Sequence, residues 1–246
     1  MNDPRFWLVV PAAGIGQRMN AGCPKQYLRI RGRFLLDITL SRLLEHDLFI
    51  DCVVPLHSAD TWWSDTEASH NARVITCRGG GERIDSVLSA LVTIEDRAQA
   101  GDWILVHDVA RPCVSHDDLT RLVTELVEHP VGGLLAAPVT DTLKVAEMGD
   151  QGVDVCGTQD RSRLWRALTP QMFRYGDLKQ ALEQAVENQC VVTDEASAIE
   201  MAGATPRIVE GRPDNIKVTL PADLAMAEFI LGQLEACPQA ATEERG

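Results

Sequence analysis

The chain has 246 residues, 45% of them apolar, which is enough for the core of one α/β domain. Its 36 Asp and Glu outnumber its 23 Lys and Arg, for a formal net charge of −13, and only 5% of residues are aromatic. This charge repels nucleic acids and anionic membranes, and the shortage of aromatic rings disfavours a stacking platform for single strands. This balance is typical of an enzyme that captures a small anion with locally placed cations, although it is also ordinary for a soluble cytosolic protein. We expect neither nucleic acid nor membrane as a partner.

Cysteine usage and apolar runs bear on where the protein resides. The seven cysteines are odd in number and widely scattered, and none forms a Cys-x-x-Cys pair, so we expect reduced thiols rather than a disulfide framework. No apolar run approaches the roughly 20 residues of a membrane-spanning helix, and the N-terminus has no secretion-signal pattern. We expect a soluble, cytoplasmic protein.

Strand-like and helix-like segments alternate along the first 139 residues. Apolar or β-branched runs predict strands at 6–10, 50–54, 73–77, 103–106 and 133–139. Apolar residues at helical spacing predict helices at 35–44, 84–94 and 119–126, and a helix is also expected in the polar stretch 59–71. Repeated β-α-β order predicts an α/β fold with a doubly wound, mostly parallel sheet and helices on both faces.

Residues 140–166 interrupt this alternation. They are polar and rich in glycine, and residues 142–145 alternate in polarity, so we predict a protruding β-ribbon arm. Beyond it we expect an extended piece at 168–173, helices around 178–185 and over 194–201, strands at 207–209 and 215–220, and a helix that begins at Pro221. The prediction is a single domain over 1–236 that includes the arm, followed by a disordered tail at 237–246.

A glycine-containing loop, VVPAAGIGQRMNAGCPKQY, follows the first predicted strand. Gly14 and Gly16 allow backbone amides to approach a phosphate closely, and Arg18 and Lys25 supply two cations suited to a polyphosphate. The loop is not a dinucleotide fingerprint, whose third glycine is replaced by Met19, nor a Walker A motif, which requires Gly-Lys-Ser/Thr. A tight turn without a ligand is the alternative for the glycines alone, and a solvated surface charge is the alternative for either cation alone.

A second glycine-rich loop, RGGGERIDSV, precedes the helix predicted at 84–94. Its backbone and the Ser86 hydroxyl can read the edge of a base, and Arg83 can serve a phosphate or a neighbouring carboxylate. A mobile linker is the alternative. Because ligands of doubly wound sheets bind at the carboxyl ends of the strands, the opening loop and the loop after strand 103–106 are expected to share one cleft.

That third loop contains Asp108 and Arg111. A lone carboxylate just past a buried strand commonly holds a divalent metal or a hydroxyl, with a strand-end cap as the alternative. Arg111 precedes Pro112, which favours an extended backbone and aims the arginine over the cleft. Thr193 is expected to cap the helix 194–201, which leaves it able to bind a substrate hydroxyl. Lys217 is expected inside the strand 215–220, where an ordinary edge-strand lysine is the alternative.

Together these motifs resemble one family, the 2-C-methyl-D-erythritol 4-phosphate cytidylyltransferases of the non-mevalonate isoprenoid route. The likeness runs in order from VVPAAGIGQRM through CPKQY, GGGERIDSV, VHDVARPC, APVTDTLK, ALTPQ and TDEAS to EGRPDNIKVT. It implies a Rossmann-like nucleotidyltransferase fold that transfers CMP from CTP to the sugar phosphate with Mg²⁺ and releases pyrophosphate. It also implies a homodimer in which the arm reaches the partner's site.

The resemblance also implies a role for individual residues. Nucleotide binding is implied for Pro11, Ala12, Ala13, Gly14 and Gly16, and reading of cytosine for Gly80, Gly81 and Ser86. Stabilisation of the pentavalent α-phosphate is implied for Arg18 and Lys25. Binding of the sugar phosphate is implied for Asp108, Arg111, Thr142, Arg161, Thr193 and Lys217. Among these, Arg161 and Lys217 would orient the attacking phosphate, and Asp108 is also the expected metal ligand.

The chain departs from this family at three positions. Gln17 stands where the family often has Arg, Gly81 where it usually has an acidic residue, and Val109 where it usually has Ala, so weaker ribose or base contacts are expected. The nearest alternative activity is a cytidylyltransferase for a pentitol phosphate such as ribitol 5-phosphate. Alternatives of another class are a module that binds a nucleotide without turning it over and a silent dimeric scaffold.

Overall fold

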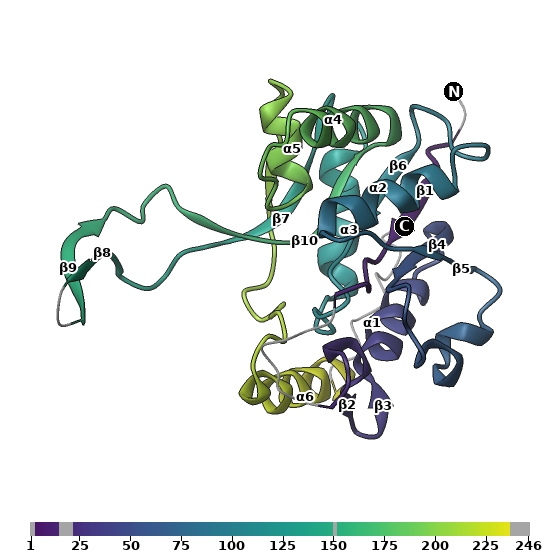
Figure 1. Cartoon of the computed structure of the whole chain (residues 1–246), viewed down its shortest axis with the longest axis horizontal. Coiled ribbons are helices and arrows are strands. Elements are labelled where there is room, and N and C mark those ends of the chain that lie inside the picture. The colour runs from purple at the N-terminus through teal and green to yellow at the C-terminus, as the bar shows by residue number, and fades with distance from the viewer. Residues whose placement is uncertain (1–2, 15–21, 150–151, 237–246) are drawn as a thin grey trace, which may run out of the picture.

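A computed structural model of the chain describes residues 3–14, 22–149 and 152–236, and a seven-stranded sheet forms its centre. The strand order is β11-β7-β10-β6-β1-β4-β5 (Figure 1). The strands are β1 (Phe6–Val9), β4 (Phe49–Leu56), β5 (Val74–Arg78), β6 (Trp103–Val106), β7 (Gly132–Pro138), β10 (Trp165–Arg174) and β11 (Arg207–Glu210). β10 is antiparallel to both of its neighbours, and the other adjacent pairs are parallel. The mostly parallel sheet is therefore confirmed.

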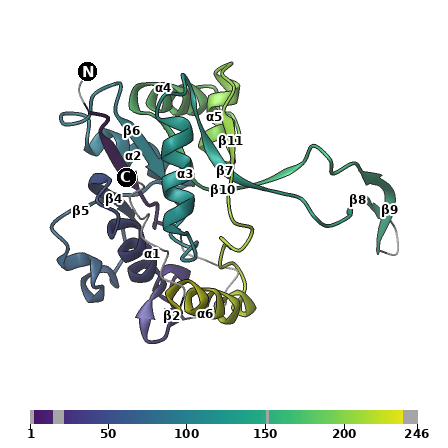
Figure 2. The ribbon, with the colours of Figure 1, turned by 180° about the vertical axis from the view of Figure 1, so that it is seen from behind.

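Helices cover both faces of this sheet, as predicted. They are α1 (Leu35–Leu44), α2 (Arg83–Thr93), α3 (His116–Leu126), α4 (Tyr175–Glu187), α5 (Glu195–Met201) and α6 (Pro221–Ala236). Alternate residues of β1 mark the two faces, because Leu8 packs in one apolar cluster with α1 and α3, whereas Trp7 and Val9 pack in another with α2, α4 and α5. Figure 2 shows α3 lying across the face opposite to α2. A third cluster seats α6 against α1.

The predicted ribbon is an antiparallel pair, β8 (Leu143–Gly149) and β9 (Gly152–Gln159), that forms a sheet of its own. It projects far from the body on two long connections (Figures 1 and 2). Every described residue of β8 is exposed, and β9 is almost as exposed. A two-stranded ribbon with no face packed on a core is marginal in water, so its surroundings must supply stability.

Two predicted elements are wrong. The stretch 59–71 contains two short 3-10 turns, Trp63–Asp65 and Ala68–His70, instead of a helix. The Asp60 carboxylate accepts hydrogen bonds from the backbone N–H groups of Trp62 and Trp63, which closes a local turn that competes with a continuous helix. The stretch 215–220 is irregular rather than a strand. Its polar backbone is satisfied by single contacts, such as the hydrogen bond from Val218 N–H to the Ala110 carbonyl.

The remaining expectations concern cysteines, membranes and the tail. The six cysteines within the described ranges are all free. Among the helices that the structure describes, none combines the length and the apolar character needed to cross a membrane. The predicted tail at 237–246 lies outside the described residues.

Candidate active site

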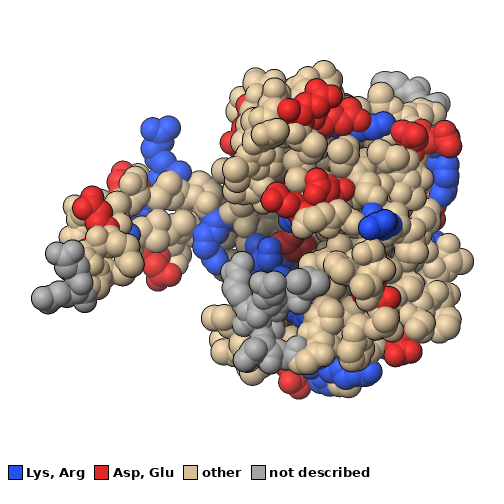
Figure 3. All heavy atoms as spheres, viewed as in Figure 1, with Lys and Arg blue, Asp and Glu red and all other residues tan. Residues whose placement is uncertain are grey.

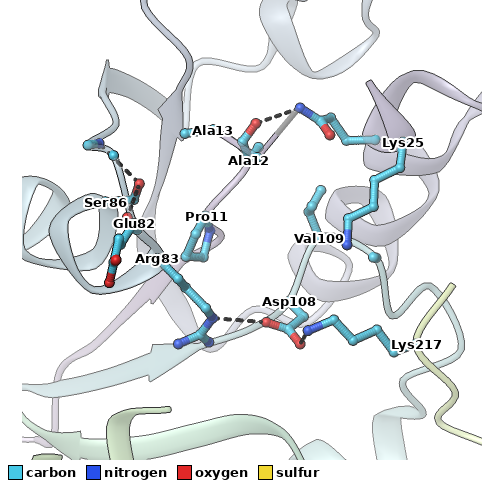
Figure 4. A pocket seen from close by; sticks show the side chains of 15 residues that line it. Pro11, Ala12, Ala13, Lys25, Glu82, Arg83, Ser86, Asp108, Val109 and Lys217 are labelled. Atoms are coloured by element: carbon cyan, nitrogen blue, oxygen red, sulfur yellow. Dashed lines mark hydrogen bonds and ion pairs between the residues drawn. The ribbon is translucent and has the colours of Figure 1, made fainter. Parts of the chain in front are cut away.

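The opening loop and the Asp108 loop meet in one pocket at the carboxyl edge of the sheet, as predicted, and the second glycine-rich loop joins them there (Figure 4). It joins the end of β1, the start of α2 and the end of β6, together with side chains from the short 3-10 turn Lys25–Tyr27 and from the segment before α6. The lining residues are Pro11, Ala12, Ala13, Gly14, Lys25, Gln26, Gly80, Gly81, Glu82, Arg83, Ser86, Asp108, Val109, Ala110 and Lys217. Ten of them were predicted site residues.

The first loop is held to the turn that carries Lys25. Gln26 is 1% exposed, and its side-chain amide donates a hydrogen bond of 2.6 Å to the Ala12 carbonyl. The Tyr27 hydroxyl donates to the Asp60 carboxylate at 2.7 Å, which ties the other end of the turn to the crossover after β4. Figure 4 shows the side-chain nitrogens of Lys25 and Lys217 directed toward the region beside Asp108. The fold therefore fixes the backbone next to Lys25 and aims its ammonium into the pocket.

The second loop owes its shape to close packing of its glycines. A Cβ on Gly79 would lie 2.3 Å from the Ala13 Cβ, and one on Gly80 would lie 2.1 Å from the Asp85 Cβ, so neither position accepts a side chain without movement. Gly81 is different, because an added Cβ would meet nothing closer than 3.8 Å. The Ser86 hydroxyl accepts a hydrogen bond from Gly80 N–H at 3.1 Å and donates to the Glu82 carbonyl at 3.2 Å. Ser86 thus lines the pocket while holding the loop in shape.

Asp108 lies among three cations. Its Oδ2 is 2.8 Å from Lys217 Nζ and 3.5 Å from Arg111 Nε, and its Oδ1 is 3.2 Å from Arg83 Nε. Burial raises the pKa of Asp108, but the charges of Arg83, Lys217 and Arg111 outweigh it and hold that pKa well below its usual value. The group is therefore a carboxylate at physiological pH, and this cluster joins three separate parts of the chain.

A second cavity adjoins the first and contains most of the residues predicted to bind the sugar phosphate. Arg83, Asp108 and Lys217 line both cavities. The other lining residues of the second cavity are Arg111, Ala167, Leu168, Thr169, Gln171, Thr193 and Asp194. Lys217 reaches this boundary because the next residue, Val218, is fully buried in the cluster beneath α6 and turns the neighbouring side chain the other way. The two cavities therefore share a boundary formed by one carboxylate, Asp108, and two cations, Arg83 and Lys217.

Other predicted site residues lie elsewhere or are not described. Thr142 and Arg161 are exposed on the arm and line neither cavity. The Arg161 guanidinium donates to the Thr140 carbonyl at the base of the ribbon. Gly16 and Arg18 lie outside the described residues. One copy of the chain therefore does not bring the arm residues to its own pocket.

The predicted cap of α5 is wrong by one residue. Asp194 is the N-cap, and its carboxylate accepts a hydrogen bond of 2.9 Å from Ser197 N–H, while the Ser197 hydroxyl bonds back to the backbone of Asp194. Asp is at least as good a cap as Thr, and this capping box uses both ends of the motif. Thr193 is thereby left exposed at the rim of the second cavity.

A buried histidine supports the Asp108 loop. His107 Nε2 lies 2.9 Å from the Arg111 carbonyl and must donate to it, and His107 Nδ1 accepts from the Thr169 hydroxyl at 3.0 Å. The same hydroxyl oxygen accepts a hydrogen bond from Asp108 N–H at 3.1 Å. Burial lowers the pKa of His107 to about 4, so the ring is neutral. Thr169 lies 62 residues from His107 in the chain, so this contact left no signal in the sequence.

The charge pattern of the surface agrees with local capture of an anion. Figure 3 shows Lys and Arg atoms in the hollow at the base of the arm, with Asp and Glu atoms on the surrounding body. Among residues 3–14, 22–149 and 152–236, no group of three or more His, Cys, Asp or Glu side chains is arranged to hold a metal ion. A Mg²⁺ ion commonly takes its remaining oxygen ligands from substrate phosphates and water.

A doubly wound sheet with two glycine-rich loops and convergent cations at its carboxyl edge defines a nucleotide-binding transferase. Comparison with known proteins gives the family. The model of the 2-C-methyl-D-erythritol 4-phosphate cytidylyltransferase family (IspD) matches residues 6–233, and the chain belongs to this family.

Similar proteins agree over almost the whole length. The chain is 48% identical to the 2-C-methyl-D-erythritol 4-phosphate cytidylyltransferase of Vibrio cholerae, over 92% of this chain and 95% of that one. It is 51% identical to the enzyme of the same name from Pseudomonas aeruginosa, over 90% and 94%. The crystal structure of the Francisella tularensis enzyme superimposes with a TM-score of 0.79 at 36% identity and covers 92% of this chain and 99% of that one.

Proposed function

We propose that the chain transfers CMP from CTP to 2-C-methyl-D-erythritol 4-phosphate, forming 4-diphosphocytidyl-2-C-methyl-D-erythritol and pyrophosphate. Membership of the family over residues 6–233 supports this reaction and does not favour the ribitol 5-phosphate alternative. The observation that carries the proposal is the shared wall of the two cavities, because Lys217 lines both the nucleotide pocket and the adjoining space. A nucleotide α-phosphate and an acceptor phosphate bound in the two spaces would meet at this wall.

The reaction needs little from the protein beyond alignment and charge. The acceptor phosphate is already a nucleophile at neutral pH, so no general base is required, and in-line attack on the α-phosphate of CTP releases pyrophosphate. Holding the two phosphates in line removes most of the entropic cost, and fixed cations stabilise the charge that develops in the transition state. Lys25 is assigned to the α-phosphate together with Arg18, and Lys217 to the acceptor phosphate together with Arg161. Cytosine is assigned to the backbone of the second glycine loop.

Mg²⁺ is proposed as the cofactor, with Asp108 as its protein ligand. The pocket fits an ion carried in by the nucleotide, because Mg²⁺ is commonly held by one or two carboxylates and by substrate phosphates. When bound, Mg²⁺ would neutralise charge on the triphosphate. Both oxygens of Asp108 already face cations, at 2.8 Å from Lys217 Nζ and 3.2 Å from Arg83 Nε. Asp108 therefore has a second role that needs no metal, which is to hold Lys217 at the boundary between the cavities.

A homodimer completes the proposed site. The ribbon exposes apolar side chains along its length, with Met148 86%, Val153 65% and Val155 63% exposed, and these need a cover. A second copy that received the ribbon would bury them and could accept Thr142 and Arg161 at its own pocket. The proposed partners are therefore CTP, the sugar phosphate and a second copy of the chain. A cytoplasmic location remains a prediction.

The test is pyrophosphate release by the purified protein with CTP, Mg²⁺ and each acceptor in turn. We expect release with 2-C-methyl-D-erythritol 4-phosphate and little with ribitol 5-phosphate. Equal or greater release with ribitol 5-phosphate would support the alternative activity. Tight nucleotide binding with no release in the presence of either acceptor would contradict the proposed reaction.

A further inference from the structure

We propose that Arg83 and Glu195 form a positioning pair that sets the Asp108 carboxylate and, through it, Lys217 for the acceptor phosphate. The proposal depends on the proposed function, since it concerns the second substrate of that reaction. The two residues come from different elements, the first residue of α2 and the first residue of α5, 112 residues apart in the chain.

The guanidinium of Arg83 is shared between two carboxylates. Its Nη1 donates to Glu195 Oε1 and its Nη2 donates to Glu195 Oε2 at 3.1 Å, so the pair is bidentate. The remaining guanidinium nitrogen, Nε, does not contact Glu195 and instead donates to Asp108 Oδ1 at 3.2 Å. A planar guanidinium held along one edge has a fixed orientation, so the position of Nε is fixed as well.

Glu195 is a firm anchor for this arrangement. Its side chain is 1% exposed, and its two chain neighbours are both held by Gln171 of β10, which is also 1% exposed. The Gln171 side-chain nitrogen donates to the Asp194 carboxylate at 2.8 Å, and its oxygen accepts from Ala196 N–H at 2.8 Å. The buried carboxylate is therefore attached to the central sheet on both sides, and a rotation of α5 cannot easily carry it away from Arg83.

The anchor decides which cation occupies which oxygen of Asp108. Arg83 takes Oδ1 through a single donor, which leaves Oδ2 to Lys217 Nζ at 2.8 Å, with Arg111 Nε farther away at 3.5 Å. An arginine that was not tied to Glu195 could turn its fork onto both oxygens of Asp108, the geometry that a carboxylate prefers, and displace the lysine. Glu195 thus keeps Arg83 from competing with Lys217. Because Arg83 lines both cavities, the pair also forms part of the wall between them.

The decisive variant is Glu195→Gln, which keeps the size of the side chain and removes its charge. We expect kcat/KM for 2-C-methyl-D-erythritol 4-phosphate to fall by about 10- to 100-fold, with a higher KM for this acceptor, because Lys217 is misplaced. The dissociation constant of CTP, measured by calorimetry without the acceptor, should change by less than about threefold, since no assigned nucleotide contact is lost. Arg83→Lys should give the same pattern, because an ammonium cannot bridge the two carboxylates.

Asp102→Asn is the matched control. Asp102 is a buried acid, 4% exposed, that forms an ion pair with Arg5. It lies directly before β6, whereas Asp108 lies just after the other end of that strand. Loss of the Asp102 charge should lower thermal stability without changing the acceptor KM.

An unchanged acceptor KM in Glu195→Gln, an equal loss of CTP affinity, or the same change in the control would overturn the proposal. If Glu195→Gln does not fold by circular dichroism, Arg83→Lys decides by the same criteria. An inactive wild-type protein would instead contradict the proposed function itself.

Discussion

Lys25 shows how the fold places a side chain that is proposed to act in catalysis. It follows Pro24, begins a 3-10 turn, and is flanked by Gln26, whose amide is locked onto the Ala12 carbonyl. The cation is thus held next to the loop that is proposed to bind the triphosphate. Its charge is worth most where negative charge increases, which is the transition state rather than the bound CTP.

Replacement of Lys25 tests this assignment. We expect Lys25→Ala to lower kcat by about 10²- to 10³-fold and to weaken CTP binding far less, because the contact strengthens as charge develops on the α-phosphate. Steady-state kinetics and calorimetric titration of CTP measure the two effects separately. The control is Lys179→Ala, which removes a lysine of α4 that pairs with Glu95. It should change neither kcat nor CTP binding. A loss confined to CTP affinity would show that the role given to Lys25 is wrong.

His107 predicts a pH dependence of stability. Its pKa is about 4 in the folded protein and near 6.5 when exposed, so the unfolded state binds more protons between these values. The free energy of unfolding should therefore fall as the pH drops from 6.5 toward 4, by up to about 3 kcal/mol, and be unaffected by this group at higher pH.

The measurement compares denaturant unfolding of the wild type and His107→Gln across this pH range. The variant lowers stability at pH 7, because hydrogen bonds to Thr169 and Arg111 are altered, but it has no imidazole to titrate. The stability difference between the two proteins should therefore shrink on acidification. A difference that stays constant from pH 7 to pH 4 would contradict a neutral, buried His107.

The arm is the element whose stability the single chain does not explain. Its apolar side chains are exposed, so we expect Val153→Glu to weaken the proposed dimer by placing a charge in the proposed interface. Val92→Glu is the matched control, since Val92 is 47% exposed on α2 and lies in the body. Light scattering at several protein concentrations gives the mass of each variant. Equal masses for Val153→Glu and the wild type at low concentration would argue against an interface on this face of the ribbon.

Regular elements were predicted well where periodicity is local. The helix α1 and the strand β6 have the predicted bounds, because their apolar patterns are continuous. The predictions for 59–71 and 215–220 were wrong for different reasons. In the first, a side chain captures the backbone N–H groups of two residues. In the second, apolar residues alternate at 216, 218 and 220, but the buried residues are Asn215 and Val218, whose spacing of three does not fit one face of a strand.

At the scale of the whole molecule, the proposed dimer predicts complementation between two inactive variants. Arg161→Ala removes a residue of the arm, and Lys217→Ala removes a residue of the body. If each site takes Arg161 from one subunit and Lys217 from the other, a mixed dimer contains one complete site. Random pairing makes half of the dimers mixed, so we expect about one quarter of the wild-type activity after exchange of subunits.

The assay is pyrophosphate release before and after the two variants are unfolded together and refolded. Each variant treated alone in the same way is the control and should stay inactive. No recovery in a mixture that contains dimers by light scattering would mean that both residues serve a site within one chain.

The sequence by itself determined the α/β class, the protruding ribbon, the glycine loops and the family, because these depend on periodicity and on residues close together in the chain. It also indicated that the opening loop, with Lys25, and the Asp108 loop would share one cleft, since parallel strands share an edge, whereas Lys217 was assigned to the site only by the family resemblance. Only the tertiary structure decided the partners of these groups. β10 inserts antiparallel between β6 and β7, which brings Thr169 to His107 and Gln171 to the start of α5, where Glu195 meets Arg83. Such contacts depend on strand order and on buried charge, and neither leaves a periodic signal along the chain.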